Sequence, residues 1–234
     1  MYPLQRNYAE STREREMSDA AAVKKPPVVT YTVIGLCVLV YICEIANLKA
    51  VEAVLIGPLQ NGGIGAAWTL FTTAFVHSPT NPTHIVFNLL AFSVLGRLIE
   101  TIYGPFRLGL LLVALTWVAS AAQLEFSGLG IGLSGVVYGI FGFMIGASPG
   151  NPFLWWFVKK NALMLIGWAV ISVVLTQSHV LAIGNVAHFG GLFYGAIYGL
   201  IFGLPRYRYA FIGLAVLIPI ILAFMLPGPI PADG

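Results

Sequence analysis

Apolar segments long enough to cross a membrane alternate along the chain with short gaps that carry proline or charge. A helix needs roughly 20 apolar residues to cross the ~30 Å hydrocarbon core of a bilayer. The pattern therefore predicts an all-α, polytopic bundle of seven membrane-spanning helices. We expect these spans at about residues 28–46, 84–103, 107–124, 134–149, 161–178, 186–204 and 209–227.

The composition supports a membrane protein and excludes several other classes. Of the 234 residues, 58% are hydrophobic and only 9% are charged, whereas about a quarter of the residues of a soluble domain are charged. The two cysteines, Cys37 and Cys43, are too few for a disulfide framework or a zinc site. Because the basic residues are scattered, they do not resemble a nucleic-acid-binding surface. We expect contact with membrane lipid, no nucleic acid, no metal and no cofactor.

The distribution of basic residues predicts the orientation. Residues 1–27 form a polar tail that lacks the apolar core of a signal peptide. With seven spans, all but one of the lysines and arginines fall on the side of this tail, and only Lys49 falls on the other side. Basic residues concentrate on the cytoplasmic side of membrane proteins, so we expect a cytoplasmic N-terminus, an external C-terminus and a location in the plasma membrane. The basic residues on the tail side are Arg6, Arg13, Arg15, Lys24, Lys25, Arg97, Arg107, Lys159, Lys160, Arg206 and Arg208.

The connection between the first two predicted spans, about residues 47–82, is unusually long. It has no charged residue after Glu52, and aromatic residues such as Trp68 and Phe71 make it too apolar for a hydrated loop. Several glycines make it a poor continuous helix. Irregular backbone at membrane depth must be covered by protein or line a watery cavity. We therefore predict a structured, partly embedded external loop.

Three polar sites lie near the outer ends of predicted spans. His84 and Asn88 are four residues apart and share one helix face, Ser134 follows a glycine-rich segment, and His188 opens the sixth span. Each site alone is most simply a packing contact between helices. Polar residues inside a membrane are costly and often functional, and three sites at one depth indicate a shared role.

The span that begins at Ser134 is short. From Ser134 to Pro149 there are about 15 residues, or roughly 23 Å of helix, which is less than the ~30 Å core. We therefore expect Ser134 to lie below the outer surface, after a loop that enters the protein interior. A helix N-terminus at that place favours negative charge.

A serine and a histidine in a recessed site can act as an activated nucleophile and its general base. Asn88 and the backbone N–H of Ser134 could donate hydrogen bonds to an oxyanion. The carboxylates fall elsewhere in the predicted topology, so we expect a dyad. Glycines that recur every four residues would let the fourth and sixth helices approach until Ser134 meets His188. These glycines are Gly191, Gly195, Gly199 and Gly203.

The motifs as a set resemble the rhomboid family of intramembrane serine proteases. The resemblance runs from Trp68 to about Gly199 and rests on three motifs. They are His84-x-x-x-Asn88, Gly132-Leu-Ser134-Gly135 with Tyr138 four residues after the serine, and Ala187-His188 followed by small residues. One departure is Trp68-Thr69, where many relatives carry Trp-Arg, and it concerns the internal support of the first loop.

The resemblance implies a fold and roles for individual residues. The fold would be a six-helix core at residues 28–204 with one additional C-terminal helix at 209–227. Ser134 would be the nucleophile and His188 the base, with His84, Asn88 and the Ser134 N–H as the oxyanion hole. Gly132 and Tyr138 would belong to the substrate-binding part, with Tyr138 packed on the base. Transmembrane proteins would be the substrates and would enter between the second and fifth helices, near Phe92, Trp168 and Ser172.

Two other classes of function stay open from the sequence. A transporter or channel could use the glycines and histidines to line a pathway, but the two halves show no evident inverted repeat. A catalytically silent client-binding scaffold is disfavoured by the intact serine and histidine. Neither the substrate nor the oligomeric state follows from the sequence.

Overall fold

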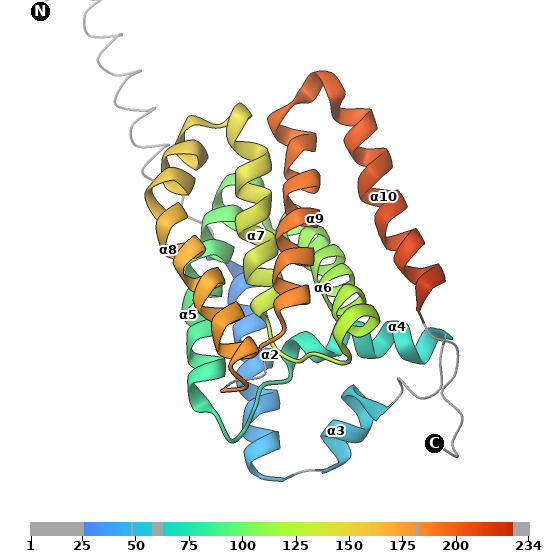
Figure 1. Cartoon of the computed structure of the whole chain (residues 1–234). Coiled ribbons are helices and arrows are strands. Elements are labelled where there is room, and N and C mark those ends of the chain that lie inside the picture. The colour runs from blue at the N-terminus through green and yellow to red at the C-terminus, as the bar shows by residue number, and fades with distance from the viewer. Residues whose placement is uncertain (1–25, 48, 58–62, 181–182, 227–234) are drawn as a thin grey trace, which may run out of the picture.

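The computed structural model describes residues 26–47, 49–57, 63–180 and 183–226, and within these ranges every regular element is a helix (Figure 1). Most of the predicted tail 1–27 and the predicted end of the last span at residue 227 lie outside the described residues. The bundle consists of α2 (Val28–Ile45), α5 (Pro82–Tyr103), α6 (Pro105–Ser127), α7 (Ser134–Ala147), α8 (Pro152–Gln177), α9 (Asn185–Gly203) and α10 (Arg208–Met225). Short elements connect them: α3 (Lys49–Leu55), α4 (Gly63–Thr72), and the 3-10 turns η2 (Thr73–Phe75), η3 (Ser148–Gly150) and η4 (Pro205–Tyr207).

The helices coincide with the predicted spans except at the start of α8. The predicted start at residue 161 is wrong, because α8 begins at Pro152, a residue that suits the first helical position. Lys159 and Lys160, which the predicted bounds place between the fourth and fifth spans, lie inside the helix. Their ammonium groups stand 5.4 and 5.0 Å from ring centroids one turn earlier, where cation–π attraction stabilises them. These pairs are Lys159 with Trp155 and Lys160 with Trp156.

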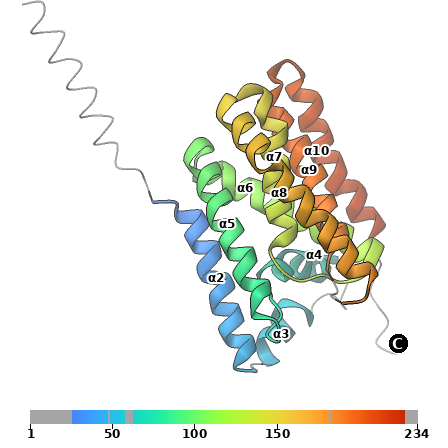
Figure 2. The same cartoon turned by 60° about the vertical axis from the view of Figure 1, so that its left-hand side comes forward.

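Among the residues that the structure describes, six helices are long and apolar enough to cross a membrane: α2, α5, α6, α8, α9 and the segment of η4 with α10. The remaining helix of the bundle, α7, has only 14 residues, which is short for a span. It lies at the centre of the bundle and packs against α5, α6, α8 and α9 (Figures 1 and 2). The fold is thus an all-α, polytopic membrane bundle, whereas the number of seven spans stays a prediction.

Helices α7 and α9 approach each other most closely. A Cβ added at Gly191, Gly195, Gly199 or Gly203 would overlap a backbone carbonyl oxygen of α7. Because glycine has no side chain, the two backbones can come into van der Waals contact, which is a main source of helix association in membranes. The predicted close approach of these two helices is confirmed.

The long connection at residues 47–82 contains α3, α4 and η2, and α4 lies across the lower end of α6 (Figure 1). The last carbonyls of a helix lack partners inside it, and at the end of α3 three side chains of α4 satisfy them. Trp68 Nε1 donates to Val54 (2.8 Å), Thr72 Oγ1 to Leu55 (2.5 Å) and Thr69 Oγ1 to Ile56 (3.3 Å). Thr69, at the position where the sequence departs from the resemblance, thus supports the loop through its hydroxyl.

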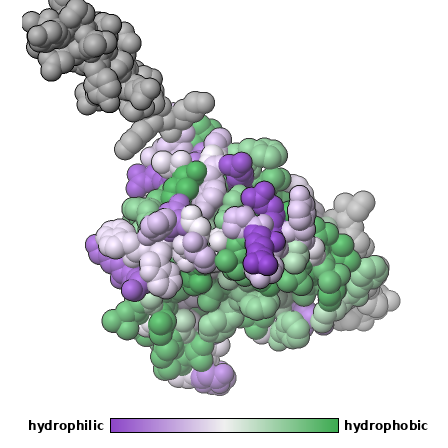
Figure 3. Space-filling view, turned by 90° about the horizontal axis from the view of Figure 1, so that it is seen from above, coloured by the Kyte–Doolittle hydropathy of each residue, from purple (hydrophilic) through white to green (hydrophobic). Residues whose placement is uncertain are grey.

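Exposed cations gather at the end of the bundle where α5 ends and α8 and α10 begin. They are Arg97, Arg107, Lys159, Lys160, Arg206 and Arg208. Figure 3 views this end, with hydrophilic residues toward its middle and hydrophobic residues around its sides. Here the buried Glu100 carboxylate accepts hydrogen bonds from the N–H groups of Val29 and Thr30 (2.9 Å each) and from Thr30 Oγ1 (2.7 Å). These bonds fasten α5 to the first turn of α2, whose N–H groups lack partners inside the helix.

Candidate active site

Three helix N-termini meet at the end of the bundle opposite the exposed cations (Figure 1). His84 lies in the first turn of α5, Ser134 is the first residue of α7, and His188 lies in the first turn of α9. The start of a helix presents unpaired N–H groups and the positive end of the helix dipole. This end of the bundle is therefore suited to stabilise negative charge.

Ser134 and His188 are in direct contact. Ser134 Oγ lies 2.7 Å from His188 Nε2, which is a hydrogen-bond distance. The two residues are 54 positions apart, and the close packing of α7 against α9 brings them together. Ser134 is partly exposed, whereas His188 is buried.

The second ring nitrogen of His188, Nδ1, is buried and makes no hydrogen bond within the part of the chain that the structure describes. If Nε2 accepts the serine proton, Nδ1 must carry the ring hydrogen, and no carboxylate is present there to hold it. Tyr138 instead fixes the ring plane, because the two rings stack with centroids 4.4 Å apart and planes 4° from parallel. The Tyr138 hydroxyl is buried near Ser172 without reaching hydrogen-bond distance.

A group of hydrogen-bond donors lies beside Ser134. Gly132 has a φ of +104°, which favours glycine, and a Cβ there would stand 2.6 Å from His84 Nε2 and 3.6 Å from Asn88 Nδ2. His84 Nδ1 accepts a hydrogen bond from the Ser78 N–H (3.4 Å). In the neutral ring the hydrogen is then on Nε2, the nitrogen that faces Gly132.

Asn88 adds a second donor at this place. Its Nδ2 donates one hydrogen to the His84 carbonyl (2.9 Å), and an amide nitrogen has a second hydrogen to donate. As the first residue of α7, Ser134 has a backbone N–H without a partner inside the helix. The predicted residues Gly132, Ser134, His84 and Asn88 thus lie together.

The first loop holds the segment that precedes Ser134. The Gly132 N–H donates to the Thr73 carbonyl (2.9 Å), and the Leu133 N–H donates to His77 Nε2 (3.5 Å). His77 Nδ1 lies 3.1 Å from the Phe75 carbonyl and donates to it. Burial lowers the pKa of His77 to about 4, so its ring is neutral at neutral pH and Nε2 can accept. The sequence analysis missed His77, although a histidine inside an apolar stretch was a signal.

Gln123 on α6 connects the two segments that carry the dyad. Its Oε1 accepts a hydrogen bond from the Ala187 N–H (3.0 Å), which belongs to the first turn of α9 and has no partner inside that helix. Its side chain also lies under Gly130, where a Cβ would stand 2.8 Å from Gln123 Cγ. The sequence analysis missed Gln123 as well, although a polar residue inside an apolar span was a signal.

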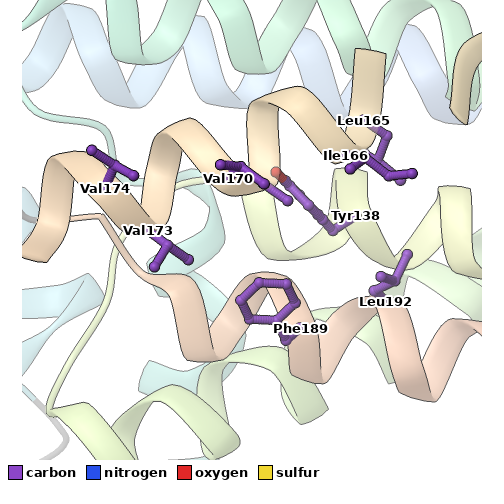
Figure 4. Close-up of a pocket in the computed structure, with 9 residues that line it drawn as sticks. Tyr138, Leu165, Ile166, Val170, Val173, Val174, Phe189 and Leu192 are labelled. Atoms are coloured by element: carbon purple, nitrogen blue, oxygen red, sulfur yellow. The ribbon is translucent and has the colours of Figure 1, made fainter. Parts of the chain in front are cut away.

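An apolar groove of about 440 Å³ lies behind Tyr138, between α8 and α9 (Figure 4). Its walls are Leu165, Ile166, Ala169, Val170, Val173 and Val174 of α8, Phe189 and Leu192 of α9, and Tyr138. The three residues suggested for substrate entry lie in different surroundings. Phe92 and Ser172 are buried, and Trp168 is exposed, with its ring 6.0 Å from that of Phe87 on α5.

The site brings together a serine hydroxyl, an imidazole and several hydrogen-bond donors. This set suits acyl transfer through serine. Among the described residues, no group of three or more His, Cys, Asp or Glu side chains could hold a metal ion.

The fold and the site define an integral, multi-pass membrane protein with a serine–histidine pair where three helix N-termini meet. A family model described as the Rhomboid domain matches residues 65–205, more than half of the chain. The chain belongs to the rhomboid family.

Curated relatives agree with this assignment. The chain is 27% identical over 229 residues to the rhomboid protease GluP of Bacillus subtilis, an alignment that covers 92% of the chain and 43% of that protein. It is 28% identical over 171 residues to the rhomboid protease GlpG of Haemophilus influenzae, covering 72% of the chain and 88% of that protein. It is 30% identical over 169 residues to GlpG of Klebsiella pneumoniae, covering 70% of the chain and 59% of that protein. The chain therefore spans less than two thirds of some relatives and most of another.

Proposed function

We propose that this chain is an intramembrane serine endopeptidase that hydrolyses peptide bonds in or near the transmembrane segments of membrane proteins. The observation that carries the proposal is the 2.7 Å contact between Ser134 Oγ and His188 Nε2. Membership of the rhomboid family and relatives named rhomboid proteases support it.

The reaction follows from the contacts around Ser134. His188 Nε2 takes the hydroxyl proton while Ser134 Oγ attacks the carbonyl carbon of the scissile bond. The oxyanion that forms accepts hydrogen bonds from the Ser134 N–H, His84 Nε2 and Asn88 Nδ2. His188 then gives its proton to the leaving amine. Water attacks the acyl-enzyme with His188 again as the base, which releases the second product and regenerates Ser134.

Among the residues that the structure describes, no carboxylate contacts the ring of the imidazolium that forms in this reaction. It lies against the face of Tyr138, where the ring quadrupole attracts a cation, and close to the oxyanion of opposite charge. We therefore assign Tyr138 the role of orienting the base and stabilising its charged form. Gly132, whose lack of a side chain leaves space beside His84, would let the substrate backbone approach.

The substrate is a transmembrane helix, whose backbone groups are hydrogen-bonded inside the helix and hidden from attack. It must unwind locally before Ser134 can reach a carbonyl. With the N-terminus in the cytoplasm, as the basic residues indicate, the site opens to the outer face. Hydrolytic water then enters from that face, and cleavage falls near the outer boundary of the substrate helix.

Cleavage of a single-span substrate in vesicles tests the proposal. Ser134→Ala and His188→Ala should each lower the rate by about 10⁴-fold or more, because a nucleophile and its base act as a unit. Ser127→Ala and His179→Ala are matched controls at exposed positions and should cleave at the wild-type rate. Cleavage by Ser134→Ala at a rate near that of the wild type would refute the assignment.

A further inference from the structure

The last helix, α10, meets the rest of the bundle along one narrow face. It packs against α9 and α6 (Figure 1), and Ala215 is its one buried residue. Ile218 and Leu222, which share a helix face with Ala215, are partly buried against the core. The other side of α10 is exposed and apolar, as expected for a helix that faces lipid.

A proline lies in the interior of α10, at position 219. Proline has no backbone N–H, so the carbonyl four residues earlier loses the hydrogen bond that a helix normally gives it. In α10 this carbonyl belongs to Ala215, the buried residue. Ala215 lies roughly 10 Å along the helix from Arg208, inside a segment that is apolar enough to cross a membrane. An unpaired carbonyl at such a depth would have no water to bond it.

The hydroxyl of Tyr194 on α9 takes the place of the missing N–H. It donates a hydrogen bond to the Ala215 carbonyl at 2.9 Å, and both residues are buried, with exposed fractions of 2% and 7%. Tyr194 lies on α9 between two of the glycines that contact α7, Gly191 and Gly195. The same helix therefore packs against α7 through glycines and binds α10 through a hydroxyl.

We propose that Tyr194 and Pro219 form a matched pair that docks α10 on the helix that carries His188. The proline frees the Ala215 carbonyl, and the tyrosine hydroxyl recognises it. An apolar helix face gains little by leaving lipid for protein, because lipid tails are as apolar as leucine. The buried hydrogen bond therefore selects which face of α10 meets α9 and at what height. This attachment is independent of the proposed protease activity.

The dependence of one residue on the other tests the pair. Tyr194→Phe removes the hydroxyl and should raise the equilibrium constant for unfolding in mixed micelles about tenfold. This is toward the upper end for hydrogen bonds between membrane helices, because the carbonyl has no other partner. Pro219→Ala returns an N–H to α10, which can then bond the Ala215 carbonyl. In that background Tyr194→Phe should change the constant by less than about twofold.

Two matched controls separate this dependence from general effects. Tyr198→Phe removes a hydroxyl one turn later in α9 and should have the same effect with Pro219 or Ala at that position. Pro152→Ala replaces a proline at the start of α8, where no helical hydrogen bond is lost, so Tyr194→Phe should keep its full effect there. An equal effect of Tyr194→Phe in the wild type and in Pro219→Ala would overturn the pair.

Hydrogen exchange gives a second measurement that does not need the proline variant to fold. In Tyr194→Phe the backbone amides at residues 212–225 should exchange about tenfold faster than in the wild type, because α10 is held less firmly. In Tyr198→Phe their exchange should equal that of the wild type. Unchanged exchange of α10 in Tyr194→Phe would show that the hydroxyl does not dock this helix.

Discussion

Helices α9 and α8 both lie beside the candidate active site, but they differ in how closely they pack against their neighbours. α9 presents glycines to α7 so closely that a Cβ at any of four positions would overlap a backbone oxygen. α8 has no such positions, and the groove behind Tyr138 separates its middle from α9. The pair α7–α9 holds Ser134 Oγ 2.7 Å from His188 Nε2. Near the same end of the bundle, α8 is joined to Asn185 of α9 by hydrogen bonds from Ser172 and to Thr176.

This difference separates two requirements of the proposed reaction. Proton transfer between Ser134 and His188 needs positions fixed to within a fraction of an ångström, and backbone contact between two helices can provide this. Entry of a helical substrate needs a wall that moves, and lightly held elements are the ones that open most often.

The largest expected difference in stability comes from replacing one glycine of α9 and one glycine of α8 by valine. Gly195→Val should destabilise the protein by about 3 kcal/mol or more, because its side chain would collide with the carbonyl of Gly139 and force the helices apart. Gly167→Val on α8, where a Cβ meets nothing within 4 Å, should change stability by less than about 0.5 kcal/mol. Unfolding of the purified protein in mixed micelles measures both. Equal losses in the two variants would contradict the difference in packing.

A smaller effect concerns how the first loop supports the segment that precedes Ser134. Because burial lowers the pKa of His77 from 6.5 to about 4, the unfolded chain binds one more proton than the folded protein between these values. The free energy of unfolding should therefore keep the full contribution of neutral His77 above pH 6.5. It should fall by up to about 3 kcal/mol as the pH drops to 4. Neutral His77 accepts the Leu133 N–H, and protonation removes that acceptor.

The control for this prediction is His77→Gln, which keeps a donor and an acceptor but does not titrate. Its stability should vary less with pH than that of the wild type over the same range. Parallel pH profiles for the two proteins would show that His77 does not couple protonation to the loop.

The sequence predicted the helical bundle and the close approach of α7 and α9, because apolar length and glycine spacing are local patterns. It also singled out Ser134, His188, His84 and Asn88, which the structure brings to one end of the bundle. It did not predict the contribution of Gln123, whose partner Ala187 is 64 positions away. Such contacts depend on how each helix is rotated about its axis, which periodicity alone does not determine.

The start of α8 was misjudged for a different physical reason. Lys159 and Lys160 each lie over a tryptophan one turn earlier, so the charged pair stays inside the helix and the helix begins before it. The hydrogen bond from Asn185 Nδ2 to Thr176 Oγ1 could not be predicted either, because it joins two different helices. Only the position of α8 relative to α9 shows that these side chains meet each other.

The most direct test of the account is to identify the residue that a fluorophosphonate modifies in the folded, membrane-embedded protein. The account predicts a single adduct on the peptide that contains Ser134, lost in His188→Ala and retained in His179→Ala, because only a serine whose proton is removed by an adjacent base reacts readily. An adduct on another serine, or labelling of Ser134 that persists unchanged in His188→Ala, would contradict it.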